Sequence, residues 1–278
     1  MKGKKGRHII VHGLIVLLLV LYAVIIILPL LWMVMSGLKT NRELFLSPWT
    51  LPEVLNFSNY LKAWSAGIGR YFLNSVIVTA LATALDLFCS CSLAFALSRY
   101  RFRGSKALLM FVISGLMLAP QVSLISNYRL LQWLHLYDTY FAIIIPTATF
   151  RIPFTTFLIW SYLVTMDKDL EEAAAMEGGR DWQALVYILM PLLKPILATG
   201  ILLTAKYAWN DFLFPLVFTE SSALKTIPYG LSSMQSTQDT NWTVLLAALT
   251  ISALPMVLLF ILLQKQFVRG LAAGGVKG

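Results

Sequence analysis

Four ionisable residues lie inside long apolar stretches of the sequence: Asp86, Arg151, Lys206 and Asp211. An ionisable side chain at membrane depth is expensive, and it usually lines a path for a polar solute or pairs with an opposite charge. Lys206 and Asn210 are four residues apart, so they share one face of a helix. Two interpretations stay open: a polar solute pathway, or pairing of Asp86 with Arg151 or Lys206 that fixes helix packing.

A second polar group lies in EEAAAMEGGRDWQALVYILMPLLKP, residues 171–195. It has acidic residues at one end, alanines, two adjacent glycines, and two prolines at the other end. The sequence contains no nucleophile–base or paired-carboxylate motif that suggests an enzyme, and no Gly-x-x-x-x-Gly-Lys-Ser/Thr phosphate loop. The three histidines have no metal-ligand spacing. We therefore expect neither an enzyme nor an ATP-hydrolysing motor, and no metal site.

Membrane-spanning helices must position both groups, as the composition indicates. Of the 278 residues, 58% are hydrophobic and 13% are charged, which is about half the charged share of a soluble domain. About 20 apolar residues suffice for a helix to cross a bilayer. The sequence predicts an all-α, polytopic membrane protein, a single transmembrane domain over residues 1–278. Its six transmembrane helices are expected near residues 9–32, 72–97, 107–125, 141–162, 195–218 and 244–263.

The distribution of basic residues predicts the orientation. The first apolar run is longer than the core of a signal peptide, which has about 7–15 residues, so we expect an uncleaved first span. Most of the 22 lysines and arginines lie in residues 1–8, 98–106, 163–194 and 264–278. Basic loops concentrate on the cytoplasmic side. Both termini are therefore expected in the cytoplasm, and the net charge of +9 is assigned to a membrane surface rather than to nucleic acid.

The loop between the fourth and fifth spans, residues 165–194, predicts a helix–turn–helix elbow. Acidic residues in its first turn would be favoured by the helix dipole. Gly178 should end the first helix, since glycine readily takes the left-handed conformation found there. A second helix should begin near Asp181, and Pro191 should bend or end it. An ordinary solvated hairpin between spans gives the same pattern, so physics alone leaves both interpretations open.

The same loop resembles the EAA motif of permease subunits of ABC importers. That motif is Glu-Ala-Ala, three residues, Gly, nine residues, Ile, one residue and Leu-Pro. The matching residues here are Glu172, Ala173, Ala174, Gly178, Ile188 and Pro191, with Met190 in place of the leucine. The fixed intervals make this resemblance specific.

The resemblance extends along most of the chain and favours the smaller permease of maltose-type carbohydrate importers. YFLNSVIV (71–78) is similar to the start of that permease's second span, FALSRYRFRGSK (95–106) to its basic loop, WNDFLFPL (209–216) to its fifth span, and QFVRGLAAGGVKG (266–278) to its tail. It implies the transmembrane domain of a type I ABC importer, in the plasma (inner) membrane of a bacterium or archaeon.

The resemblance further implies a coupling helix that docks on an ATPase subunit. The coupling residues would be Asp169, Leu170, Glu171, Glu172, Ala173, Ala174, Met176, Glu177 and Gly178. The implied partners are a second, homologous permease, two ATP-binding subunits, an extracytoplasmic solute-binding protein, a sugar and membrane lipid, with no nucleic acid. This chain would hold no cofactor, because ATP and Mg²⁺ would be bound by the partner ATPase.

The substrate pathway is assigned to Arg151, Lys206, Trp209, Asn210, Asp211 and Phe212. The rings of Trp209 and Phe212 would be platforms for sugar faces, whereas a structural or gating role is favoured for the Asn-Asp pair. Family resemblance favours a di- or oligosaccharide, and glycerol-phosphate-type substrates stay open. If Arg151 and Lys206 face the cavity unpaired, an anionic glycan is expected, but the in-span carboxylates could equally neutralise them.

An ion-gradient-driven secondary transporter is the alternative function. It would use Asp86 or Asp211 as a proton or cation site, and internal repeats would be expected. The two halves of the sequence show no clear repeat. This alternative also leaves the polar elbow unexplained.

Overall fold

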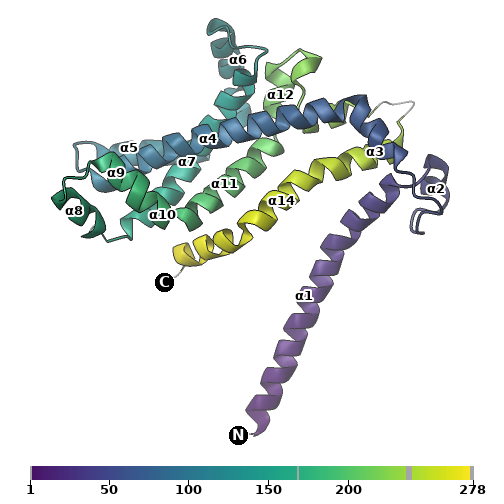
Figure 1. Ribbon diagram of the computed structural model, residues 1–278, viewed down its shortest axis with the longest axis horizontal. Coiled ribbons are helices and arrows are strands. Elements are labelled where there is room, and N and C mark those ends of the chain that lie inside the picture. Colours follow the sequence, from purple (N-terminus) through teal and green to yellow (C-terminus); the bar gives the residue numbers. More distant parts are fainter. Residues whose placement is uncertain (1, 168, 236–239, 276–278) are drawn as a thin grey trace. The chain divides into compact units, whose positions relative to one another are not determined.

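The computed structural model describes residues 2–167, 169–235 and 240–275 (Figure 1). Every regular element within these residues is a helix, and none is a strand. The expected all-α class of a polytopic membrane protein is therefore confirmed.

Four helical stretches are long and apolar enough to cross a membrane: Val11–Gly37, Ser58–Arg99, Tyr140–Val164 and Trp242–Gly270. Two further pairs of helices pass the same criterion together but are bent: Ser105–Met117 with Pro120–Trp133 by 99°, and Asp181–Leu192 with Lys194–Trp209 by 81°. The described residues thus give four spans, or six if each bent pair is one span. The limits of the six expected spans and the single domain stay predictions.

The chain contains two compact units. The first comprises Met1–Ile68 and Ser233–Ala253. Its elements are α1 (Lys2–Gly37), α2 (Asn41–Leu46), α3 (Ser58–Ala63), η1 (Trp64–Ile68) and the beginning of α14 (Trp242–Gly275). Thr40 and Glu43 form a capping box at the start of α2, and the buried Lys39 donates from Nζ to the carbonyl oxygens of Ser47 and Pro48, at 2.8 and 3.2 Å. These bonds hold the segment after α1 in place.

The second unit comprises Gly69–Ser232 and Leu254–Gly278. Its elements before the elbow are α4 (Gly69–Arg99), α5 (Ser105–Ser114), η2 (Gly115–Met117), η3 (Pro120–Ser123), α6 (Leu124–Trp133) and α7 (Tyr140–Val164). The elbow contains α8 (Asp169–Met176), α9 (Asp181–Gln183), η4 (Ala184–Leu189) and α10 (Met190–Leu192). After it come α11 (Lys194–Trp209), α12 (Leu213–Phe218), η5 (Ser222–Leu224), α13 (Ile227–Ser233) and the remainder of α14.

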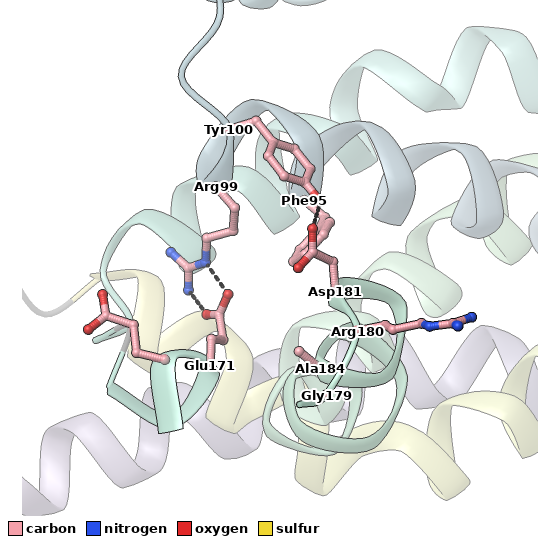
Figure 2. Close-up of a pocket in the computed structure, with 9 residues that line it drawn as sticks. Phe95, Arg99, Tyr100, Glu171, Gly179, Arg180, Asp181 and Ala184 are labelled. Carbon is pink, nitrogen blue, oxygen red and sulfur yellow. Dashed lines mark hydrogen bonds and ion pairs between the residues drawn. The ribbon is translucent and has the colours of Figure 1, made fainter. Parts of the chain in front are cut away.

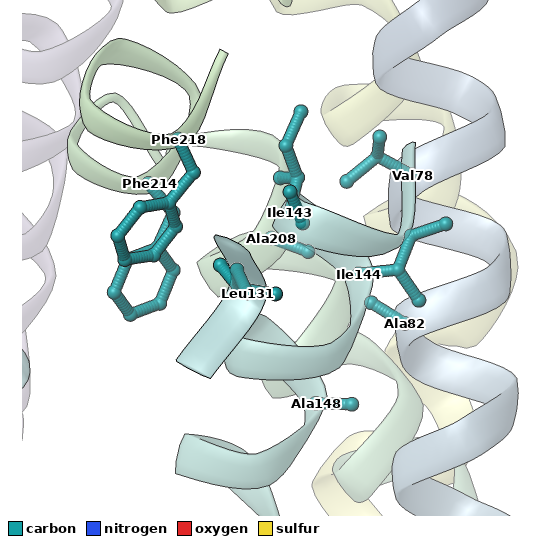
Figure 3. Close-up of a cluster of buried hydrophobic side chains, with 10 residues drawn as sticks. Val78, Ala82, Leu131, Ile143, Ile144, Ala148, Ala208, Phe214 and Phe218 are labelled. Atoms are coloured by element: carbon teal, nitrogen blue, oxygen red, sulfur yellow. The ribbon is translucent and has the colours of Figure 1, made fainter. Parts of the chain in front are cut away.

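Helices α4, α7 and α11 pack side by side in this unit (Figure 1). Figure 3 shows the apolar cluster at one end of the three helices, which also includes α6 and α12. Phe214 and Phe218 stack there with ring centroids 5.5 Å apart and planes 12° apart. Full burial of one such side chain contributes about 1.5–3 kcal/mol, so this cluster fixes α12 against α7.

A buried carboxylate joins the same three helices. Asp86 of α4 is fully buried and accepts hydrogen bonds from Ser90, Thr155 of α7 and Thr204 of α11, at 2.9, 2.8 and 2.7 Å. The described residues show no ion pair between Asp86 and Arg151 or Lys206. Asp86 therefore fixes helix packing through hydroxyl groups rather than through a paired cation.

One expected span, residues 107–125, is not a continuous helix. The helical segment ends at Met117, and Leu118 and Ala119 have extended backbone with ψ of 124° and 137°. Pro120 then begins η3. The proline ring disfavours helical backbone in the residue before it, which explains the 99° bend inside an otherwise apolar run.

Candidate functional site

The elbow has the expected order of helix, turn and helix. Helix α8 ends at Met176, Gly178 has φ of +83°, and α9 begins at Asp181. A Cβ atom at Gly178 would have no neighbour within 4 Å. Glycine is therefore required there by the left-handed backbone, which costs other residues about 1–2 kcal/mol, and not by lack of space.

Arg99, the last residue of α4, binds the elbow with both edges of its guanidinium (Figure 2). Its Nη2 lies 2.6 Å from Oε1 of Glu171, and its Nε donates to Oε2 at 3.0 Å. Its Nη1 donates to the carbonyl oxygen of Leu163 in α7, also at 3.0 Å. The two charged side chains are 7% and 14% exposed. A planar, two-point Arg–carboxylate pair is among the stronger and more specific polar contacts in proteins, so α4, α7 and α8 meet at one guanidinium.

Tyr100 attaches the second helix of the elbow. Its hydroxyl donates to Oδ2 of Asp181, the first residue of α9 (Figure 2). This hydrogen bond raises the pKa of Tyr100 above its ordinary value, with a smaller contribution from burial. Phe95 packs edge-on against the Tyr100 ring, with centroids 5.8 Å apart. The end of α4 thus binds both helices of the elbow.

A cavity of about 200 Å³ lies between these contacts. It is lined by Phe95, Arg99, Tyr100, Glu171, Glu172, Gly179, Arg180, Asp181 and Ala184.

An apolar cluster connects the elbow to the long helices. The buried members of the cluster are Cys91, Ala94, Phe95, Ile159, Leu163, Leu189, Leu193 and Ile196, from α4, α7, η4 and α11 and the residue between α10 and α11. The elbow therefore shares one packed apolar cluster with α4, α7 and α11.

The predicted coupling residues have different positions in the elbow. Glu171 is turned towards Arg99 and mostly buried, whereas Asp169, Glu172, Met176 and Glu177 are exposed, Met176 by 89%. The side chains of Leu170, Ala173 and Ala174 lie outside the described residues. Sequence reasoning missed Arg99 and Tyr100, whose only signal was their place in the basic loop at the end of the second span.

A larger concavity of about 840 Å³ contains most of the predicted pathway residues. Its lining includes Arg151, Lys206, Asn210, Asp211 and Phe212. Trp209 does not line it. That residue is 6% exposed and packs edge-on against Phe72, with centroids 5.8 Å apart. The indole therefore belongs to the packing between α4 and α11.

Asp211 has a structural role at the break between α11 and α12. Its Oδ1 accepts from the backbone N–H groups of Leu213 and Phe214 at 3.0 and 3.3 Å, and its Oδ2 accepts from Thr147 at 3.2 Å. Asn210 donates from its amide to the carbonyl oxygen of Lys206 at 2.8 Å. Asp211 thus satisfies backbone N–H groups at the start of α12 that have no partner within that helix, whereas the Asn210 amide adds a second hydrogen bond to a carbonyl oxygen that already accepts from the Asn210 backbone N–H.

Arg151 in the concavity contacts aromatic rings. Its guanidinium carbon lies 4.8 Å from the ring centroid of Phe154 and 5.4 Å from that of Tyr207. Both rings also line the concavity. Sequence reasoning missed them, although Phe154 follows Arg151 by three residues and so shares its helix face.

Comparison with known proteins identifies the family. Residues 87–273 match the family described as binding-protein-dependent transport system inner membrane component. The chain belongs to this family. It is thus a permease subunit of a binding-protein-dependent ABC importer, a multi-pass protein of the inner membrane, and it is the transport subunit rather than the ATPase.

Individual relatives resemble the chain over most of its length. It is 47% identical over 260 residues to the probable ABC transporter permease protein YurM of Bacillus subtilis (strain 168), covering 94% of this chain and 87% of that protein. It is 31% identical over 255 residues to the arabinooligosaccharides transport system permease protein AraQ of the same organism, covering 90% of both. A chain of the bacterial ABC transporter involved in import of the acidic polysaccharide alginate has a similar fold, with a TM-score of 0.81 and 23% identity, covering 92% of this chain and 96% of that chain.

Proposed function

We propose that this chain is the smaller permease of a carbohydrate importer and that its elbow is the EAA coupling loop. The loop would lie in the cytoplasm, as would both termini. The intervals of the motif support this proposal, and so does the order α8, Gly178, α9. The observation that carries it is the attachment of both elbow helices to the end of α4, through Arg99 and Tyr100. A solvated connecting hairpin has no need of such an attachment.

The geometry supports a mechanical role for the elbow. The exposed side of α8 would dock on one of two ATP-binding subunits, which bind ATP and Mg²⁺. When those subunits close on ATP, the docked helix would move, and Arg99 and Tyr100 would carry the motion to α4. The apolar cluster beneath the elbow would carry it to α7 and α11. The helices that line the large concavity would then switch it between the two sides of the membrane.

The cargo proposed for this pathway is an oligosaccharide. Relatives about 31% identical to this chain are named for uptake of diacetylchitobiose, arabinooligosaccharides and trehalose/maltose. A binding protein would deliver the sugar from outside, and a second, homologous permease would complete the pathway. The concavity supplies what a sugar needs: polar groups from Lys206 and Asn210 beside the partly exposed ring of Phe212.

Substitution of Gly178 tests the coupling role. In the full importer reconstituted with its binding protein, Gly178→Val should cost about 1–2 kcal/mol of loop conformation and lower sugar-stimulated ATP hydrolysis and uptake together. Glu172→Lys, which reverses an exposed charge on α8, should weaken co-purification with the ATPase. Gly179→Ala is the matched control, because Gly179 is not among the described residues with positive φ.

Two results would contradict the proposal. One is normal uptake by the Gly178→Val importer after the ATPase has dissociated. The other is uptake by this chain alone, driven by an ion gradient, which would favour a secondary transporter instead.

A further inference from the structure

We propose that the large concavity binds an acidic saccharide, a sugar chain with carboxylate groups, and that Arg151 and Lys206 bind its negative charge. The inference rests on the proposed function, because it names the class of sugar for the same pathway. The inferred contact is made directly between the sugar and the side chains of Arg151 and Lys206.

The guanidinium of Arg151 has unused hydrogen-bond donors. Arginine carries five N–H donors. Among the described residues none of these donors has a hydrogen-bond acceptor, and the buried Nε is without a partner. The guanidinium lies over the faces of Phe154 and Tyr207. A guanidinium stacked on rings keeps its edge available for two-point binding of a carboxylate.

The carboxylates inside the spans are bound to other groups. Asp86 is occupied by three hydroxyl groups. Asp211 is occupied by two backbone N–H groups and the hydroxyl of Thr147. Within the described part of the chain, neither forms an ion pair with Arg151 or Lys206. Asp86 and Arg151 attract each other electrostatically, but they are too far apart to form an ion pair, so neither carboxylate occupies the hydrogen-bond donors of Arg151.

The lining of the concavity has a positive balance. Two cations, Arg151 and Lys206, and one carboxylate, Asp211, line a space of about 840 Å³, which is within the range of about 300–1,000 Å³ for small-molecule sites. An unpaired charge at membrane depth is unfavourable, so an occupant with negative charge is preferred over a neutral one. Neutral hydroxyl groups can accept hydrogen bonds from both residues, but they supply no charge.

The shape of the lining also suits a sugar ring. Phe212 is 38% exposed, and its ring lines the same space as both cations. The amide of Asn210 and the side chain of Gln121 add polar groups at the lining. A carboxylate on the sugar can therefore be bound by Arg151 while a ring face contacts an aromatic side chain.

Equilibrium binding to the complete importer in lipid nanodiscs, without the binding protein, tests the inference. The probes are trigalacturonate and its fully methyl-esterified form, which have the same skeleton and differ in charge. At low salt the acid should bind at least about 10-fold more tightly, which is about 1.4 kcal/mol. Arg151→Gln and Lys206→Gln should each reduce that preference, whereas Arg151→Lys and Lys206→Arg should retain most of it.

Lys225→Gln is the matched control. Lys225 also lies over an aromatic ring, with Nζ 5.1 Å from the ring centroid of Tyr229, but it does not line the concavity. Its loss should leave the preference for the acid unchanged.

Three results would overturn the inference. They are equal affinity for acid and ester, equal loss of both in Arg151→Gln, and failure of Arg151→Gln to assemble with the second permease. The last result would mean that the partner permease supplies the missing carboxylate. The proposed function has a separate readout, because its failure would appear in the ATPase and uptake measurements on Gly178→Val and not in this binding assay.

Discussion

Arg99 and Arg151 are the same residue type used in opposite ways. Arg99 is 7% exposed, and its nitrogens are bound to a carboxylate on α8 and a carbonyl oxygen on α7. Arg151 has rings beside it and no acceptor in the described residues. A guanidinium with its acceptors in place holds helices together. One without acceptors is available to a molecule that brings them. The contrast distinguishes the proposed coupling elbow from the proposed substrate pathway within one compact unit.

The largest loss of stability and transport is expected from substitution of Arg99. Arg99→Met leaves Glu171 as a mostly buried carboxylate without its partner, and breaking such a pair costs about 3–5 kcal/mol. Uptake and sugar-stimulated ATP hydrolysis should be lost, and amide hydrogen exchange in α8 should accelerate. The double variant Arg99→Met/Glu171→Met should recover part of the protection in α8, because no charge is then left unpaired. Similar exchange in wild type and Arg99→Met would contradict the attachment.

A smaller loss of elbow stability is expected from substitution of Tyr100. Tyr100→Phe removes one hydrogen bond to a carboxylate at an exposed position, which should cost about 1 kcal/mol. Exchange should increase at α9 more than at α8, since Asp181 begins α9. A uniform increase over the whole elbow would argue against separate attachment of its two helices.

The Tyr100 contact also has a defined pH dependence. The hydrogen bond to Asp181 raises the pKa of Tyr100 above its ordinary value, which is about 10. The stabilisation is therefore fully present below about pH 10 and is lost as pH rises through the raised pKa. Exchange at α9 measured up to and above pH 10 should show this loss in the wild type and not in Tyr100→Phe.

The smallest effect on stability is expected at Arg151. Arg151→Met removes a charge that makes no hydrogen bond in the described residues, so the free energy of unfolding of the importer should stay within about 1 kcal/mol of the wild type or rise. Arg151→Met and Arg99→Met change the same residue type, and each is the control for the other. A large destabilisation in both would remove the distinction between the two arginines.

Most of the local structure of the elbow could be predicted from the sequence. Fixed intervals predicted α8, the left-handed Gly178 and the start of α9, because turn chemistry and helix termination depend on neighbouring residues. The partner of Glu171 could not be predicted, since Arg99 is 72 positions away and nothing local indicates which helix ends meet. Docking on an ATPase stays a prediction.

The concavity was predicted less completely. In-span charges pointed to Arg151 and Lys206, but their depth could not tell whether Asp86 would bind a cation or three hydroxyl groups. Trp209 was grouped with Asn210 and Asp211 through adjacency in the sequence, although neighbouring residues on a helix face different directions. The break after Met117 was hidden in an apolar run, in which composition is uniform and only Pro120 marked the interruption.

The planar, two-point contact between Arg99 and Glu171 determines which motions of α8 can be transmitted to α4. A contact made through one atom lets the two bodies swivel about it, whereas two parallel bonds in one plane resist rotation as well as separation. Torque on α8 would then pass into α4 together with translation. A lysine at this position would keep an ion pair with Glu171 but make it through a single nitrogen, so it would transmit translation and not rotation. An importer with Arg99→Lys is therefore expected to stay assembled while its helices rearrange incompletely.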